Sequence, residues 1–304
     1  MTPQLRSLLF VPGDSERKQL KARSSGADAL ILDLEDSVAA AQLPLARGLV
    51  RQVLQAPRQA GPAIWVRTNS LASGQFLEDL AAIFPGAPAG LVLPKVSAAA
   101  EIIQIHEYLV ALEMRDSRPP GSTQLIVIAT ETPQAVLNLP AFAQVLATAP
   151  AAAARVAALT WGSEDLSAAI GARSKVDTGT GALSFTFQLA RSLCLLAAAA
   201  MGIPAIDGVH VDFRDAKGLE REAADARRDG FAGKLAIHPE QIAVINSAFN
   251  PTEPELARAR RIVAAFAASP EAGVLSLDGE MIDRPHLVQA QRILKLAAQR
   301  QGHS

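Results

Sequence analysis

The stretch ADALILDLED, residues 27–36, joins an apolar run to a group of acids. Its centre, 29–32, is apolar on both faces, which is typical of a parallel strand that helices cover on both sides. Asp33, Glu35 and Asp36 follow at its carboxyl end. Burying an unpaired charge is unfavourable, so we expect these acids to lie at the edge of a sheet. The stretch therefore predicts a buried parallel strand that ends in a polar rim.

Similar runs recur along the chain, and amphipathic helical patterns such as 98–114, 215–229 and 239–248 lie between them. The eight strand candidates are RSLLFVPG (6–13), ADALILDLED (27–36), AIWVRTN (63–69), AGLVLPK (89–95), QLIVIATET (124–132), VAALTWGSED (156–165), AIDGVHVD (205–212) and GKLAIHP (233–239). Eight alternating β/α units over about 250 residues are typical of a closed barrel. The sequence thus predicts an α/β fold, a (β/α)8 TIM barrel. An open doubly wound sheet is the alternative, but its glycine-rich turn after the first strand is missing, and GTGA after Asp177 follows no strand.

The C-terminal segment differs from the repeating pattern. We expect a barrel domain over 1–250 and a C-terminal helical extension or lid over 251–304. Thr252 is a helix N-cap candidate, with Glu253 and Glu255 in the first turn that follows it. Asp278 and Gly279 predict a turn, and a final helix is expected from about residue 285.

Composition excludes some classes of function. Hydrophobic residues make up 49% of the chain, enough for a large core, and 29 basic residues balance 30 acidic ones. No basic block interleaved with aromatic residues occurs, which argues against nucleic acid as a partner. No apolar run has the length of a membrane span, and the first residues lack the pattern of a signal peptide. The single cysteine, Cys194, lies in an apolar run and is expected in the core. We expect a cytoplasmic protein.

The active site of a (β/α)8 barrel lies at the carboxyl ends of its strands. Glu131 and Asp165 end consecutive runs, so their carboxylates can converge. Two carboxylates, with water and substrate oxygens in the other positions, suit Mg²⁺, with Mn²⁺ as the alternative ion. Glu164 is the rival ligand, or else it caps the following helix or braces the site.

Other charged residues also lie at the strand ends. Arg67 in WVRTN can clamp a substrate carboxylate through two parallel hydrogen bonds, or form a salt bridge to the acids at 33–36, and both are compatible. Glu35 and Asp36 are candidates for metal ligands, although bracing Arg67 or a metal-bound water is the favoured interpretation. Lys95 is expected to pair with an acid, and His238 to fix the turn into the next helix.

The same residues carry a resemblance to a known family. The chain resembles the citrate lyase β-subunit-like proteins of the HpcH/HpaI aldolase group, which include malyl-CoA and citramalyl-CoA lyases. The shared motifs run in order through nearly the whole chain: RSLLFVPG, LDLEDSV, VRTN, LPK, IATET, GSEDL, DFRD, GFAGKLAIHPEQ and SLDGEMIDRP. LDLEDSV, GKLAIHPEQ and the final DG-MIDRP are specific in combination.

The resemblance implies a magnesium-dependent lyase. It would cleave a β-hydroxyacyl-CoA such as malyl-, citramalyl- or citryl-CoA to acetyl-CoA and a 2-keto acid, or form the β-hydroxyacyl-CoA from these two compounds. By resemblance, Glu131 and Asp165 hold the metal, and Arg67 binds the substrate carboxylate beside Glu131. Family members form homotrimers or homohexamers, in which the C-terminal segment closes a neighbour's site and the acid matching Asp283 acts as the base. Without the resemblance, the residues indicate only that Asp283 is an N-cap-like residue before Pro285.

The resemblance leaves other activities open. They are a malyl-CoA-type thioesterase, a 2-keto acid aldolase that does not use CoA, and a β subunit acting on a substrate bound to an acyl carrier. The aldolases use a histidine base, for which His238 is the strand-end candidate. Glu280 departs from the family pattern, which has lysine there, and the loop 174–185 is less basic than a CoA-binding loop of this family, although Arg173 and Lys175 remain.

Overall fold

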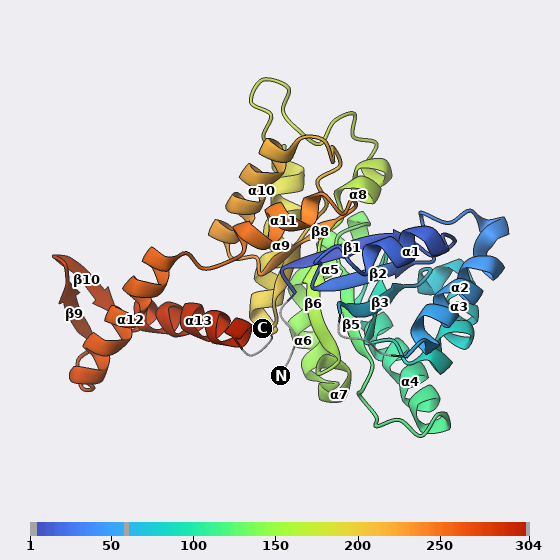
Figure 1. Cartoon of the computed structure of the whole chain (residues 1–304), viewed down its shortest axis with the longest axis horizontal. Helices are drawn as coiled ribbons and strands as arrows, with labels where there is room; N and C mark the ends of the chain where they lie inside the picture. Colours follow the sequence, from blue (N-terminus) through green and yellow to red (C-terminus); the bar gives the residue numbers. More distant parts are fainter. Residues whose placement is uncertain (1–4, 58–60, 302–304) are drawn as a thin grey trace. The chain divides into compact units, whose positions relative to one another are not determined.

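A computed structural model describes residues 5–57 and 61–301. Eight parallel strands form a closed barrel in the order β1 to β8, and β8 pairs back with β1 (Figure 1). The predicted fold is confirmed. Each strand lies within its predicted run: β1 Ser7–Pro12, β2 Ala29–Asp33, β3 Ala63–Arg67, β4 Gly90–Leu93, β5 Gln124–Ile128, β6 Val156–Thr160, β7 Ala205–Asp207 and β8 Gly233–Ala236.

Helices follow the strands and surround the barrel (Figure 1). The three amphipathic patterns found in the sequence correspond to α4, α10 and α11. The helices of the barrel unit are α1 Glu16–Ala22, α2 Leu43–Gln55, α3 Phe76–Ile83, α4 Ala99–Arg115, α5 Pro133–Asn138, α6 Phe142–Ala147, α7 Pro150–Ala153, α8 Ser163–Ile170, α9 Phe185–Ala200, α10 Ala216–Asp229 and α11 Gln241–Ala248.

The alternation of side chains along the strands decides what faces the barrel interior. On β2, Ala29 and Ile31 belong to the interior core, and Asp33 has the same parity. On β3, Trp65 is a core residue, and Arg67 lies two positions further along. Asp33 and Arg67 are register partners. The strand pattern therefore places this acid and this base together inside the barrel at its carboxyl end.

The chain divides into two compact units, Leu5–Ala248 and a unit that begins at Phe249. The second unit contains α12 Glu253–Ala268, β9 Val274–Leu277, β10 Glu280–Asp283 and α13 Arg284–Gln301. Thr252 caps α12 as predicted, because its hydroxyl accepts the backbone N–H of Glu255. A small core holds this unit together, formed by Ala259, Ile262, Phe266, Ile282 and Ala290.

β9 and β10 form an antiparallel hairpin around the predicted turn. Asp278 and Gly279 have φ angles of 54° and 81°, which is the conformation of a two-residue hairpin turn. Leu275, Leu277 and Ile282 pack toward α12 and α13. Val274 and Met281 on the opposite face are exposed.

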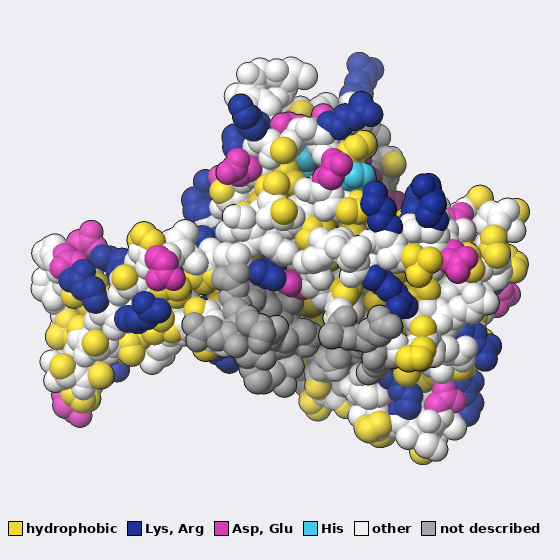
Figure 2. All heavy atoms as spheres, viewed as in Figure 1, with side chains coloured by type: hydrophobic (Ala, Val, Ile, Leu, Met, Phe, Trp, Pro, Cys, Tyr) yellow, Lys and Arg dark blue, Asp and Glu magenta, His cyan; other side chains and the backbone are white. Residues whose placement is uncertain are grey.

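Two further features agree with the sequence. Cys194 is fully buried on α9, and burial raises the pKa of its thiol, which makes it a core residue rather than a nucleophile. None of the helices within the described ranges has the length and hydropathy that a membrane crossing needs. On the face shown in Figure 2, basic and acidic side chains are interspersed with apolar ones.

Candidate active site

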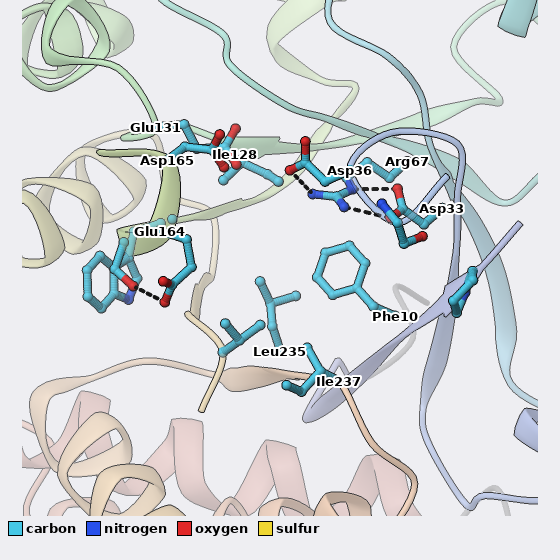
Figure 3. A pocket seen from close by; sticks show the side chains of 16 residues that line it. Phe10, Asp33, Asp36, Arg67, Ile128, Glu131, Glu164, Asp165, Leu235 and Ile237 are labelled. Atoms are coloured by element: carbon cyan, nitrogen blue, oxygen red, sulfur yellow. Dashed lines mark hydrogen bonds and ion pairs between the residues drawn. The ribbon is translucent and has the colours of Figure 1, made fainter. Parts of the chain in front are cut away.

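A cavity of about 370 Å³ opens at the carboxyl ends of the barrel strands. One side is apolar and comes from β1, β5, β7 and β8 and the loops after them. The other side is charged and comes from the ends of β2, β3, β5 and β6 (Figure 3). The apolar side includes Phe10, Ile128, Val209, Leu235 and Ile237, and the charged side includes Asp33, Asp36, Arg67, Glu131, Glu164 and Asp165.

Arg67 is held by the acids at the end of β2. Its Nε and Nη2 donate to the two carboxylate oxygens of Asp33 at 2.7 and 2.6 Å, and its Nη1 lies 3.0 Å from Glu35. The guanidinium also lies over the ring of Phe10, 4.7 Å from its centre. Burial alone would raise the pKa of Asp33, but the hydrogen bonds and charge of Arg67 outweigh it and hold the pKa below its ordinary value. The predicted salt bridge between Arg67 and the acids at 33–36 is present.

Lys95 connects acids that follow β2 with acids that follow β5 and β6. Its ammonium forms ion pairs with Glu35 and with Asp36 at 3.3 Å, and it lies 3.2 Å from Asp165. Its backbone N–H donates to Glu131 Oε2 at 2.5 Å. Burial would lower the pKa of Lys95, but contact with Glu35 and the charges of Asp165 and Asp36 raise the pKa above its ordinary value, which favours the cationic form. The expected pairing of Lys95 with an acid is present.

Glu131 is a buried carboxyl group among other acids. Only 4% of the residue is exposed. Burial, with the charges of Glu35 and Asp165, raises its pKa to about 8, although the hydrogen bond from Lys95 acts in the opposite direction. Gly162 leaves room for this side chain, because a Cβ there would lie 2.8 Å from Glu131 Cγ. The fold thus holds Glu131 at a position where neighbouring protein groups do not fully offset the negative charge of its ionised form.

The two acids that follow β6 differ in their surroundings. Asp165 contacts Lys95 and contributes to the raised pKa of Glu131. Glu164 is more exposed and pairs with Lys175. Figure 3 shows the carboxylates of Glu131 and Asp165 next to each other, and Glu164 in a different part of the cavity. The geometry therefore favours Asp165 over Glu164 as the partner of Glu131.

This arrangement fits a hard divalent cation that keeps water or substrate ligands. Across 5–57 and 61–301, no group of three or more His, Cys, Asp or Glu side chains is arranged as a complete metal cage. Mg²⁺ does not need such a cage, because one or two carboxylates usually suffice. Five carboxylates (Asp33, Glu35, Asp36, Glu131 and Asp165) surround the cations Arg67 and Lys95, so the cluster is negative when all are ionised. A dication would offset that excess where Glu131 and Asp165 meet.

Other residues considered from the sequence lie in different surroundings. His238 stacks on Phe213 with ring centres 4.7 Å apart, and its Nδ1 accepts the N–H of Glu240, which fixes the turn before α11. Asp283 lies in the C-terminal unit at the end of β10, and its Oδ1 is 2.5 Å from His286 Nδ1. Its backbone N–H also donates to the same histidine at the start of α13.

Asp207, which ends β7, faces the covering helices instead of the cavity. It pairs with Lys234 Nζ at 2.8 Å and Arg191 Nε at 2.9 Å, and accepts the indole N–H of Trp161 at 2.7 Å. Burial would raise its pKa, but the two cations hold the pKa below the ordinary value. Asp207 therefore braces the wall behind the site.

Sequence reasoning missed three contributors. The sequence indicated Asp33 as a strand-end acid but not as the bidentate partner of Arg67. Asp33 lies on the same side of β2 as Ala29 and Ile31, and this spacing could have placed it inside the barrel. Phe10 has no sequence signal for its contact with a guanidinium 57 positions away. The need for glycine at 162 depends on the rotamer of Glu131, which only the folded barrel defines.

Comparison with known proteins agrees with this geometry. Residues 6–239 match the family model described as HpcH/HpaI aldolase/citrate lyase. The mitochondrial citramalyl-CoA lyase of Mus musculus is 35% identical over 297 residues, covering 96% of this chain and 86% of that protein. The (3S)-malyl-CoA thioesterase of Cereibacter sphaeroides is 33% identical over 294 residues, covering 96% and 94%.

A solved structure extends the likeness to three dimensions. The crystal structure of protein CitE from Mycobacterium tuberculosis in complex with magnesium, acetoacetate and coenzyme A superposes with a TM-score of 0.76 at 33% identity, covering 96% of this chain and 98% of that one. Sequence and fold agree. The chain belongs to the HpcH/HpaI aldolase/citrate lyase family and is an enzyme of the carbon–carbon lyase class.

Proposed function

We propose that this enzyme is a Mg²⁺-dependent lyase that interconverts a β-hydroxyacyl-CoA with acetyl-CoA and a 2-keto acid. Malyl-, citramalyl- and citryl-CoA are the candidate substrates. The observation that carries the proposal is the buried Glu131 beside Asp165, across the same cavity from an arginine that is already fixed in place. Relatives with lyase names and a structural neighbour with magnesium and coenzyme A support it.

Glu131 and Asp165 would hold the ion, and Mn²⁺ is the alternative metal for the same oxygen ligands. The raised pKa of Glu131 supports this role, because a nearby dication favours the ionised form. When bound, Mg²⁺ supplies stabilisation for negative charge that develops on substrate oxygens. Glu35 and Asp36 keep Arg67 and Lys95 in position beside the ion.

Arg67 would orient the substrate carboxylate. Asp33 occupies the Nε and Nη2 edge of the guanidinium, and this pairing fixes its plane. The Nη1 side lies toward Glu35 and Asp36, and Arg67 lines the cavity. A fixed guanidinium loses little freedom when it binds a second anion, so it is well prepared for a carboxylate next to Glu131.

Asp283 would supply the base, from the C-terminal unit of a neighbouring subunit in a homotrimer or homohexamer. Asp283 pairs with Val274 across the hairpin, and Met281 lies on the same exposed face. Val288 on α13 is exposed as well. Exposed apolar side chains around the half-buried Asp283 support docking of this hairpin as a lid over another subunit's cavity.

The proposed chemistry is a retro-aldol cleavage. The Asp283 carboxylate takes the proton of the substrate hydroxyl, and the O–H electron pair forms the carbonyl of the 2-keto acid. The electrons of the carbon–carbon bond pass to the thioester as an enolate, which takes the proton back from Asp283 to give acetyl-CoA and restore the carboxylate. In the condensation direction the same carboxylate removes a methyl proton from acetyl-CoA.

Product analysis tests the reaction. The full chain is incubated with Mg²⁺ and each of the three thioesters, and we expect one of them to yield acetyl-CoA and a 2-keto acid. Glu131→Gln and Asp165→Asn should each abolish Mg²⁺ binding and turnover, whereas Asp225→Asn on the exposed side of α10 should retain both. Full activity of either cavity variant would contradict the metal assignment.

Mixed subunits test whether the site is shared. Glu131→Gln and Asp283→Asn proteins should each be inactive. When they are refolded together as a head-to-tail oligomer, about a quarter of the sites combine an intact barrel with an intact neighbouring hairpin, so activity should return. No recovery in an oligomer shown to contain both variants would place Asp283 outside the neighbour's site.

The thioesterase activity is the second candidate, because a relative of similar identity carries that name. It predicts free hydroxy acid and CoA as products. A carrier-dependent β subunit predicts turnover only with an acyl-carrier protein. An aldolase acting without CoA would need a free histidine base, and the stacking of His238 on Phe213 disfavours it.

Glu280 has a local explanation. It pairs across the hairpin with Leu277, which faces the small core, and its carboxylate forms an ion pair with Arg258 on α12. Asp283 and Met281 lie on the opposite face. Glu280, where the family pattern has lysine, therefore affects the attachment of the hairpin to α12. It does not lie on the face that carries Asp283.

A further inference from the structure

Lys95 has an unusual backbone conformation. It follows β4 with a φ of 55°, a left-handed conformation that lysine rarely adopts. In this conformation its N–H donates to Glu131 Oε2 at 2.5 Å. Residues held in such conformations cluster at functional sites, where the surrounding structure maintains them. The backbone of Lys95 therefore orients one of the two acids proposed to hold the metal.

The side chain of the same residue reaches the other acid. Its Nζ lies 3.2 Å from Asp165 Oδ1 and 3.3 Å from Asp36 Oδ1, and it forms an ion pair with Glu35. Glu35 and Asp36 come from the loop after β2, and Asp165 comes from the first turn of α8, which follows β6. One lysine thus joins acids that would otherwise repel each other.

We propose that Lys95 is an internal counter-ion that holds the metal-binding acids together in the metal-free protein and competes with the divalent ion for Asp165. This inference rests on the proposed Glu131/Asp165 metal pair. When the ion binds, Asp165 exchanges its contact with the ammonium for the ion, while Glu35 and Asp36 retain Lys95. Because like charges within a few ångströms repel, the ammonium weakens metal binding, and Lys95 acts as a positioning residue.

This proposal predicts two effects of opposite sign for Lys95→Met. The substitution keeps the backbone N–H and the length of the side chain but removes the charge. Calorimetric titration of the chelator-treated full chain should show Mg²⁺ binding tightened on the order of 10-fold relative to the wild type. In EDTA the same variant should melt at a lower temperature, because Glu35, Asp36 and Asp165 lose their shared cation. If Lys95 had only a structural role, Lys95→Met would lower both the Mg²⁺ affinity and the melting temperature.

Three further variants make the test selective. Lys95→Arg keeps the charge and should bind Mg²⁺ within about 3-fold of the wild type. Lys95→Gln should repeat the result of Lys95→Met if the methionine variant folds poorly. Lys175→Met is the matched control, since Lys175 pairs with Glu164 at the same rim. Its Mg²⁺ affinity should not change.

The outcomes separate this proposal from the metal assignment. If Glu131→Gln and Asp165→Asn leave Mg²⁺ binding intact, the proposed metal pair is wrong. If those variants lose Mg²⁺ but Lys95→Met binds it no more tightly than the wild type, the counter-ion role of Lys95 is wrong and the metal pair stands. If Lys175→Met tightens binding instead, Glu164 is the ligand and Lys95 does not compete.

Discussion

Gly162 shows how a single residue without a side chain leaves room for the buried carboxyl group of Glu131. The residue has ordinary extended angles, φ −120° and ψ 122°, so alanine fits its backbone. A Cβ, however, would lie 2.8 Å from Glu131 Cγ and 3.2 Å from its Oε1. The constraint is therefore the close approach of Glu131.

At this scale we predict that Gly162→Ala moves Glu131 and weakens Mg²⁺ binding by about 10-fold while the barrel stays folded. Titration calorimetry measures the affinity, and circular dichroism checks the fold. Gly48→Ala on α2 is the matched control, because no atom lies within 4 Å of the position its Cβ would take. It should leave Mg²⁺ affinity unchanged and stabilise the protein by about 0.5–1 kcal/mol. Equal affinities for the two variants would contradict the role of Gly162.

The pairing of Asp33 with Arg67 is another residue-scale effect. Burying either charge alone would be strongly unfavourable, whereas the bidentate pair satisfies both. The sequence suggested this salt bridge only as one of two interpretations of Arg67. The strand register shows that the pair forms in the barrel interior, beside the cavity.

At the scale of elements, the β9–β10 hairpin depends on its turn. Gly279 has a φ of 81°, and no atom lies within 4 Å of an added Cβ, so only the backbone conformation disfavours a side chain there. Arg261 pairs with Asp278, the other turn residue, and holds the turn against α12. The hairpin carries Asp283 at its end.

We predict that Gly279→Ala destabilises this hairpin by about 1 kcal/mol, because alanine in the left-handed region costs roughly that much. Hydrogen exchange should increase over 274–283, lyase activity should fall, and Mg²⁺ binding by the barrel should be unaffected. Gly273→Ala, one residue before β9 and also without near neighbours, provides the comparison and should change none of the three. Loss of Mg²⁺ binding in Gly279→Ala would contradict the prediction that the barrel binds the metal independently of the hairpin.

At the scale of the whole molecule, a buried ion pair at the opposite end of the strands from the cavity sets the acid stability. Arg155, just before β6, donates to both oxygens of Glu113 on α4 at 2.8 and 2.6 Å, and both residues are fully buried. Burial would raise the pKa of Glu113, but Arg155 and the backbone N–H groups of Gly121 and Thr123 lower it to about 2. The ionised form is therefore favoured in the folded state.

The lowered pKa of Glu113 determines how the stability of the protein changes with pH. Because the pKa of Glu113 is about 2 when folded and 4.5 as its ordinary value, the pair stabilises the protein above pH 4.5 and loses its contribution as the pH falls toward 2. Glu113→Gln should lower the free energy of unfolding by about 3 kcal/mol at pH 7 and flatten its decline between pH 4.5 and 2. Urea unfolding at a series of pH values measures both. Asp225→Asn, which removes an exposed pair with Arg228, should change neither.

Most of the fold was predictable from the sequence. Strands buried on both faces leave continuous apolar runs, so the eight runs identified the eight strands and the barrel they close. The helices α4, α10 and α11, the cap at Thr252 and the turn at Asp278-Gly279 were equally visible, because their signals are local. The runs were longer than the strands, since hydrophobicity does not mark where a strand leaves the sheet.

The candidate site was predictable only in outline. The position of Glu131, Asp165, Arg67 and Lys95 at the strand ends follows from chain order, because parallel strands place all their carboxyl ends at one rim. Which acid meets which cation depends on distances across the barrel. The choice of Asp165 over Glu164, the bidentate contact of Arg67 with Asp33 and the space at Gly162 all required those distances.

The sequence by itself determined the barrel, the acidic rim and the family, because local patterns and ordered motifs indicate each of them. The tertiary structure decided the rest. It placed the ammonium of Lys95 between acids of the loop after β2 and an acid of α8, turned Asp207 toward α9 and put Asp283 on an exposed hairpin face. The physical reason is that charge pairing and desolvation depend on separations of a few ångströms between residues far apart in the chain, and only folding fixes those separations.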